Sequence, residues 1–255
     1  MSRIYLPVLH ISNNRISITE EKAHYLASVL RCRKGDNLIV FDGEGNCLKT
    51  TIIKIDRREV IAEVIEKFPC NLESSVNIVL VQALLKGDKM DLVIQKTTEL
   101  GVKEIIPVIT ERSQIRDTRK VNRWRKIAEE ASRQSGRSVV PVIRELVEFK
   151  KFFSTQTSIN YPPVSPLTEG WRKGCGFIFY EEGGMQLSDA VSSLVPRPSA
   201  ILVVIGPEGG FTKEEIDLAQ ERDLIATTLG KRILRAETAA ISAVTLVQFL
   251  LGDIG

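Results

Sequence analysis

The chain has 255 residues, of which 43% are hydrophobic, so it can bury the core of one large domain or of two ordinary ones. Its formal net charge of only +3 excludes a protein that attracts polyanions through its whole surface. No apolar run approaches the ~20 residues of a membrane-spanning helix. Residues 1–18 lack the long apolar stretch of a signal peptide, so we expect a soluble, cytoplasmic protein.

The four cysteines do not indicate a metal site. Cys32, Cys47, Cys70 and Cys175 are scattered, include no C-x-x-C pair, and are accompanied by only two histidines. Scattered thiols are typical of a reducing compartment, so we expect free cysteines that pack as small apolar side chains, and no metal.

Residues 1–73 predict a small β-rich domain with one helix. Residues 37–55 contain two strand-like runs around the turn sequence DGEGN, which predicts a β-hairpin. Alternating apolar residues over 58–68 predict a further strand, and residues 20–31 predict a helix that ends near Gly35. The simplest assembly of these elements is a small β-barrel.

From residue 74 onward, apolar strands alternate with helical patterns, which predicts an α/β domain with a parallel sheet. The expected strands are 76–84, 104–110, 139–143, 177–181 and 201–205, and the expected helices are 89–100, 121–135 and 188–194. Residues 156–174 predict a loop.

Positive charge is concentrated in residues 111–137. This segment holds nine Lys or Arg residues and four acidic ones, a net charge of +5, so the rest of the chain sums to −2. Local charge of this kind is typical of a contact with a polyanion such as RNA. The alternative is a solvated helix face that binds nothing.

Two glycine-bearing loops near the end of the chain predict a ligand pocket. The apolar run 201–205 predicts a buried strand that leads into the loop GPEGG at 206–210. Thr212 and Glu215 then form a capping box, which predicts the start of a helix. A second loop, around Gly230, also leads into a helix. Because such loops place ligands at the carboxyl edge of a parallel sheet, we expect both to share one pocket.

The first loop does not match the common nucleotide motifs. GPEGG is not G-x-G-x-x-G, and no P-loop lysine follows it. Glu208 would repel a pyrophosphate, so a ligand with a cationic centre fits better. The alternative is a tight turn that needs glycine for its backbone geometry alone.

Seven sequence blocks, taken together and in this order, resemble the 16S ribosomal RNA uridine-N3 methyltransferases of the SPOUT superfamily (the RsmE family). The blocks are HYLASVLRCRKGD, FDGEG, LLKGDKMDLVIQKTTELGV, PVITERS, ASRQSGR, IGPEGGFTKEEI and LGKRILRAETAA. The resemblance implies a PUA-like RNA-binding β-barrel over residues 1–73 and a SPOUT methyltransferase domain, an α/β parallel sheet with a trefoil knot, over residues 74–255. It also implies S-adenosylmethionine as cofactor, 16S ribosomal RNA or the small ribosomal subunit as partner, and a homodimer.

The resemblance and the two loops together give the cofactor candidates. They are Tyr180, Glu181, Ile205, Gly206, Pro207, Glu208, Gly209, Gly210, Leu229, Gly230, Ile233, Leu234, Glu237, Thr238 and Ala239. Leu229, Ile233 and Leu234 offer apolar walls for an adenine, and ordinary core packing is the alternative for each.

Arg235 and Glu208 are the catalytic candidates. Methylation at N3 requires loss of the imide proton, and the resulting charge spreads onto the neighbouring carbonyl oxygens, where the Arg235 guanidinium would stabilise it. Glu208 would balance the sulfonium. The alternative for Arg235 is a pair with Glu237 or with a helix end.

The RNA-binding candidates combine the N-terminal domain with the basic segment. They are Arg31, Arg33, Arg112, Arg116, Arg119, Lys120, Arg123, Lys126, Arg133 and Arg137.

Residues 241–251, ISAVTLVQFLL, predict a helix that is apolar on most of its circumference. Such a helix at a chain end favours cover by a second subunit, and burial within one subunit is the alternative.

Other functions fit part of the sequence. A non-catalytic RNA-binding or ribosome-associated module would leave the two glycine loops unexplained, and a small-molecule α/β enzyme would leave the basic segment without a role. A SPOUT methyltransferase that acts on a different RNA is a further alternative.

Overall fold

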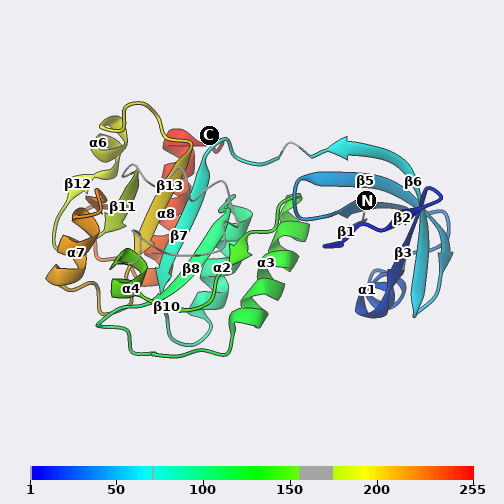
Figure 1. Cartoon of the computed structure of the whole chain (residues 1–255), viewed down its shortest axis with the longest axis horizontal. Coiled ribbons are helices and arrows are strands. Elements are labelled where there is room, and N and C mark those ends of the chain that lie inside the picture. The colour runs from blue at the N-terminus through cyan, green and yellow to red at the C-terminus, as the bar shows by residue number, and fades with distance from the viewer. Residues whose placement is uncertain (1, 71, 155–174) are drawn as a thin grey trace. The chain divides into compact units, whose positions relative to one another are not determined.

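The computed structural model describes residues 2–70, 72–154 and 175–255, so the loop predicted at 156–174 lies outside the described residues. The chain divides into two compact units (Figure 1). The first unit is Met1–Glu73 with Ser132–Val140, and the second unit is Ser74–Ala131 with Pro141–Gly255. Among the described residues, no helix is long and apolar enough to span a membrane.

The first unit is built on a six-stranded sheet. Its strands pair in the order β1 (Ser2–Tyr5), β4 (Asn37–Phe41), β5 (Asn46–Ile55), β6 (Glu59–Pro69), β3 (Arg15–Thr19) and β2 (Ile11–Ser12). Because side chains alternate along a strand, Ile16 and Ile18 of β3 are buried while their neighbours are exposed. The predicted helix is α1 (Glu20–His24) followed by a π-helical turn, η1 (Tyr25–Val29). The predicted hairpin is confirmed by the antiparallel pairing of β4 with β5.

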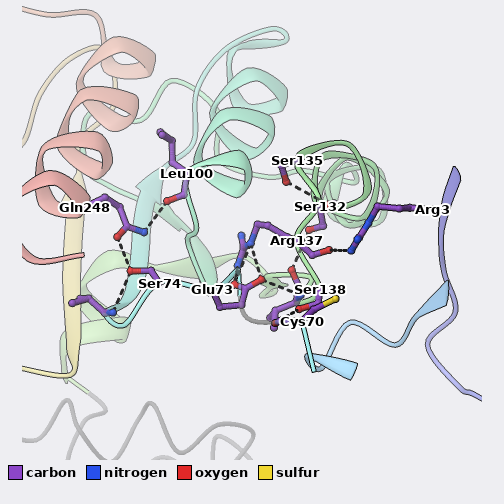
Figure 2. A network of polar contacts seen from close by, with 12 residues as sticks. Arg3, Cys70, Glu73, Ser74, Leu100, Ser132, Ser135, Arg137, Ser138 and Gln248 are labelled. Carbon is purple, nitrogen blue, oxygen red and sulfur yellow. Dashed lines mark hydrogen bonds and ion pairs between the residues drawn. The ribbon is translucent and has the colours of Figure 1, made fainter. Parts of the chain in front are cut away.

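Residues 132–140 group with the first unit although they come about 60 residues after its sheet. Arg137 is only 3% exposed and forms an ion pair with Glu73 at 2.7 Å (Figure 2). Glu73 also accepts a hydrogen bond from the Val139 N–H at 3.2 Å. Ser138 Oγ donates to the Cys70 carbonyl at 3.2 Å. The sequence prediction did not assign this segment to the N-terminal domain.

Cys47 and Cys70 form a disulfide, so the expectation of free cysteines is wrong for this pair. The antiparallel pairing of β5 with β6 brings the two Cα atoms to 5.9 Å. A separation of 23 residues says nothing about that register, and the pairing was therefore not visible in the sequence. Cys32 is a free cysteine, as expected.

The second unit is built on an eight-stranded sheet in which all pairs are parallel. The strand order is β10 (Val147–Glu148), β8 (Glu104–Ile109), β7 (Asn77–Ala83), β13 (Ala200–Ile205), β11 (Gly176–Phe179), β14 (Ile225–Thr228) and β12 (Met185–Gln186), and β9 (Val142–Ile143) also pairs with β8. The α/β fold class is therefore confirmed. The trefoil knot stays a prediction.

Helices cover both faces of this sheet. The helices are α2 (Lys89–Glu99), α3 (Val121–Ser135), α4 (Phe149–Ser154), α6 (Leu187–Ser192), α7 (Lys213–Gln220) and α8 (Ala236–Leu251). Leu202 and Val204 of the fully buried β13 pack in one cluster with side chains of α4 and α7. The alternate residues of β13 face the other way, where α8 contacts the strand and packs on α2.

The end of α8 is fixed by a buried polar contact. Gln248, which is fully buried, accepts a hydrogen bond from Ser74 Oγ at 2.7 Å and donates one to the Leu100 carbonyl at 2.8 Å (Figure 2). Because buried polar groups are unfavourable without partners, this network fixes the rotation of α8 about its axis.

Candidate functional site

The carboxyl ends of three adjacent strands meet at one cavity in the second unit. β11 pairs with β13 and also with β14, so that Phe179 lies opposite Ile205 on one side and Thr227 on the other. The loops that follow β13 and β14 therefore lie at the same edge of the sheet, as the sequence predicted.

This cavity has a volume of about 370 Å³. Its lining residues are Lys89, Phe179, Tyr180, Glu181, Ile205, Gly206, Pro207, Glu208, Gly210, Thr228, Leu229, Gly230, Lys231, Arg232, Ile233, Leu234, Arg235, Ala236 and Ala239. The size and the mixture of apolar, acidic and basic side chains suit a small ligand with both an apolar and a charged part.

The loop 206–210 is held by contacts at both of its ends. The predicted capping box is present: Glu215 Oε2 accepts from the Thr212 N–H at 3.0 Å, and Thr212 Oγ1 accepts from the Glu215 N–H at 3.3 Å. The other oxygen of the buried Glu215 accepts from the Glu111 N–H at 2.8 Å. Arg112 donates to the Gly209 carbonyl at 3.2 Å, so the loop is also tied to the segment that follows β8.

The backbone conformation at position 210 favours glycine. Its φ of +69° lies in the left-handed region that side chains with a β carbon rarely adopt. A β carbon there would also meet the end of the Glu181 side chain, which would have to shift. The glycine therefore lets an acidic side chain of the neighbouring strand end approach the loop backbone.

Glu208 extends from this loop to the start of α2. Its Oε1 accepts hydrogen bonds from Lys89 Nζ at 2.9 Å and from the Lys86 N–H at 3.3 Å. Burial alone would raise the pKa of the Glu208 carboxyl, but these hydrogen bonds and the positive charge of Lys89 outweigh it and lower the pKa. Glu208 is therefore an anion at neutral pH.

Most of the predicted cofactor residues lie in the lining of this cavity. The predicted residues absent from it are Gly209, Glu237 and Thr238. Gly209 instead contacts Arg112, and Glu237 is 9% exposed beside Lys89, with 3.9 Å between Glu237 Oε2 and Lys89 Nζ.

The structure adds lining residues that the sequence did not predict. They are Lys89, Phe179, Thr228, Lys231, Arg232 and Ala236. Lys231 and Arg232 lie within the block LGKRILRAETAA, next to predicted cofactor residues. That position in the sequence could have indicated that they line the cavity. Lys89 is more than 100 residues away from either loop, and its helical pattern gave no indication of a role.

Arg235 is exposed at the cavity, at the position just before α8. In the part of the chain that the structure describes, its side chain forms no ion pair, and Glu237 is paired with Lys89 instead. The alternative in which Arg235 serves only to pair with Glu237 is therefore not supported.

The predicted RNA-binding residues are in different environments. Arg31, Arg33, Arg119 and Lys126 are exposed, whereas Arg123 forms an ion pair with Asp91 at 2.5 Å. The others contact carbonyls or a ring: Arg116 binds the Glu111 carbonyl at 2.7 Å, Lys120 the Gly87 carbonyl at 3.2 Å, and Arg133 lies 5.3 Å from the Tyr25 ring centroid.

Arg137 is not on the surface. Its guanidinium is 4% exposed and occupied by Glu73, so a structural role in the first unit replaces the predicted contact with RNA. Over the described ranges, no group of three or more His, Cys, Asp or Glu side chains is arranged to hold a metal ion.

Comparison with known proteins gives consistent matches along the chain. Residues 72–248 match the RNA methyltransferase domain family, and residues 18–65 match the RNA methyltransferase PUA domain family. A ribosomal RNA small subunit methyltransferase E from Bacillus subtilis is 33% identical, with 91% of this chain and 89% of that protein covered. The protein of the same name from Rickettsia conorii is 30% identical, with 98% and 96% covered.

A solved structure is similar over its whole length. The crystal structure of a ribosomal RNA small subunit methyltransferase E from Neisseria gonorrhoeae bound to S-adenosyl methionine covers 100% of both chains, with 31% sequence identity and a TM-score of 0.86.

Proposed function

The chain belongs to the ribosomal RNA small subunit methyltransferase E family, and on that premise we propose that it transfers a methyl group from S-adenosylmethionine to N3 of a uridine in 16S ribosomal RNA. The family predicted from the sequence blocks and the N-terminal PUA domain are thereby confirmed. The observation that carries the proposal is the cavity at the ends of β13, β11 and β14, where an ionised acid and an exposed guanidinium lie close to apolar walls.

The cofactor fits the chemistry of this cavity. Leu229 and Leu234 offer apolar surface for the adenine, and the glycine loops let backbone groups approach its edge. Glu208 and Glu181 supply negative charge for the sulfonium and the amino group. The related protein from Neisseria gonorrhoeae was crystallised with this cofactor, which supports the same ligand here.

The reaction requires that the protein position the uracil and stabilise the charge that develops on it. It does not require a strongly nucleophilic side chain. The bound cofactor supplies an activated methyl group on a positively charged sulfur. The protein must place N3 of the uracil in line with that methyl group. As N3 loses its proton, negative charge grows on the two flanking carbonyl oxygens, and the exposed guanidinium of Arg235 at the cavity would stabilise it.

We propose that the exposed cations bind the RNA backbone. Arg31 and Arg33 belong to the first unit, and Arg119 and Lys126 to the second. At the cavity itself, Lys231 and Arg232 are exposed beside Ile233, whose 86% exposure is unusual for an isoleucine. Cations next to an exposed apolar side chain suit a strand whose bases are unpaired.

Replacing Arg119 and Lys126 with alanine should weaken RNA binding and leave cofactor binding unchanged. Both side chains are exposed, so their removal costs little stability. Each lost phosphate contact should reduce the slope of log affinity against log salt by about 0.7 for a single strand. Measurement of RNA affinity across a salt series checks this, and a slope equal to that of the unmodified protein would contradict it.

We also propose a homodimer in which α8 contributes to the interface. The buried side of α8 packs in its own unit, but Leu246 is 39% and Phe249 is 59% exposed. Apolar residues exposed together on one helix favour cover by a partner. A light-scattering mass of one chain at micromolar concentration would rule the dimer out.

Because ribosomal RNA is the substrate, we propose a cytoplasmic location.

Two measurements test the function. Calorimetric titration with S-adenosylmethionine should show one site per chain, whereas a non-catalytic RNA-binding module or an unrelated small-molecule enzyme would not bind it. Mass spectrometry of 16S ribosomal RNA nucleosides should show loss of 3-methyluridine when the gene is deleted. Loss of a different methylated nucleoside would instead support a methyltransferase with another target.

A further inference from the structure

Lys89 occupies a position that is electrostatically unfavourable for a lysine. It is the first residue of α2, and the N-terminus of a helix carries partial positive charge that favours anions. Its side chain is 35% exposed and lines the cavity. An ammonium group in this place needs compensating negative charge nearby.

Two acids from different elements supply that charge. Glu208, from the loop after β13, approaches Lys89 Nζ to 2.9 Å, and Glu237, from the first turn of α8, approaches it to 3.9 Å. Lys89 therefore connects three elements that the sequence keeps far apart.

Glu237 depends on this cation more than Glu208 does. It is 9% exposed, and its Oε2 is buried and accepts no hydrogen bond from the residues that the structure describes. A buried carboxylate without donors is costly unless a positive charge is close. Lys89 is the cation that the structure places there.

We propose that Lys89 is a positioning residue of the cofactor cavity, which holds Glu208 and Glu237 in place as carboxylates so that the cavity presents fixed negative charge to a cationic ligand. This inference rests on the proposed function, because it takes the sulfonium cofactor as the ligand. Lys89 acts through the two acids and needs no contact with the methyl group.

Other charged groups near Glu208 do not replace Lys89. The ones that line the same cavity are Glu181 from the end of β11 and Lys231, Arg232 and Arg235 from the loop after β14, and Arg112 contacts the neighbouring Gly209. Lys86 reaches Glu208 only through its backbone N–H. Among the described residues, Lys89 is thus the one side chain that forms an ion pair with Glu208.

Removal of the ammonium group should change how cofactor binding depends on pH. In the unmodified protein the pKa of Glu208 is lowered, so Glu208 stays ionised in mildly acidic solution. Lys89→Met removes the hydrogen bond and the positive charge that lower the pKa of the Glu208 carboxyl, so that pKa rises. As the pH falls through that raised pKa, the cavity loses negative charge and affinity for a cation.

The experiment compares cofactor affinity of Lys89→Met with that of the unmodified protein, by calorimetry at about pH 8 and about pH 5.5. We expect the ratio of the two dissociation constants to grow by up to about twofold between these pH values, because a Glu208 carboxyl whose pKa is raised by about one is at most half protonated at the lower pH. Using the ratio removes the titration of the cofactor itself. Lys86→Met is the matched control, because its contact with Glu208 is made by the backbone, and its ratio should stay constant.

A constant ratio for Lys89→Met across pH would overturn the proposal, because a merely structural lysine would weaken binding equally at every pH. The double variant Lys89→Met/Glu208→Gln should lose most of the pH dependence, because Lys89 acts through that acid. If Lys89→Met does not fold, Lys89→Gln retains a polar head group and tests the same loss of charge.

A second readout does not need the cofactor. NMR titration of the protein labelled with 13C at glutamate carboxyls, with the Glu208 signal assigned by Glu208→Gln, should show a higher pKa in Lys89→Met. If this higher pKa is present but the unmodified protein binds no S-adenosylmethionine, the contact is right and the proposed function is wrong. An unchanged Glu208 pKa would overturn the inference whatever the protein binds.

Discussion

Arg235→Ala should lower kcat by about two to three orders of magnitude, the typical cost of losing one donor that stabilises charge in a transition state. Its guanidinium lines the cavity and forms no ion pair within the described part of the chain, so it is available to the substrate. Because the charge on uracil develops only during the reaction, the affinity for S-adenosylmethionine should change much less. Single-turnover kinetics at saturating cofactor and RNA measure the effect directly.

Two further variants separate the proposed role from a general loss of positive charge. Arg235→Lys should restore activity poorly, because an ammonium group cannot bridge two carbonyl oxygens as a planar guanidinium does. Arg222→Ala, which removes an arginine outside the cavity lining, should leave the rate unchanged. A near-normal single-turnover rate for Arg235→Ala would show that the charge is stabilised by another group.

Glu73→Ala should destabilise the first unit by about 3–5 kcal/mol, the usual cost of removing one partner of a buried ion pair. Arg137 is almost fully buried and contacts Glu73 through more than one nitrogen, so the variant leaves a charged guanidinium without its carboxylate. Glu73 also accepts from the Val139 N–H, which would lose that acceptor. Denaturant unfolding of the purified variant measures the change in stability.

Two further variants serve as controls for the effect of Glu73→Ala on stability. Glu59→Ala removes the exposed partner of Lys54 and should cost less than about 1 kcal/mol. Glu73→Ala/Arg137→Met should recover part of the lost stability, because an apolar side chain replaces the unpaired charge. If Glu73→Ala is as stable as Glu59→Ala, the ion pair contributes nothing and Arg137 is solvated in solution.

The site could be predicted where the signal is local. The run 201–205, the glycines at 206–210 and the Thr212–Glu215 capping box all lie within 15 residues, and each carries its structural meaning in its own residue types. The strand register could not be predicted. β14 is only four residues long, yet its pairing with β11 is what brings the second loop to the first.

Contacts between distant segments were not visible in the sequence. Lys89 reads as the first residue of an ordinary amphipathic helix, and only the fold brings it to Glu208. In the sequence, Arg137 is one of several cations in a basic segment. Only the structure shows that Arg137 is buried against Glu73, whereas Arg119 is exposed. Charge alone therefore predicts a basic region well and its individual contacts poorly.

The assignment of residues 132–140 to the first unit has a consequence for the order in which the protein folds during synthesis. The six strands of that unit leave the ribosome first, but Glu73 and the Cys70 carbonyl receive their partners only after residue 139 has been made. The nascent N-terminal segment must therefore wait, incompletely packed, while residues 74–131 of the second unit are translated. For the same reason, a gene fragment that stops after codon 73 encodes the first unit without its buried arginine. The product of that fragment should be less stable than the same unit in the intact chain.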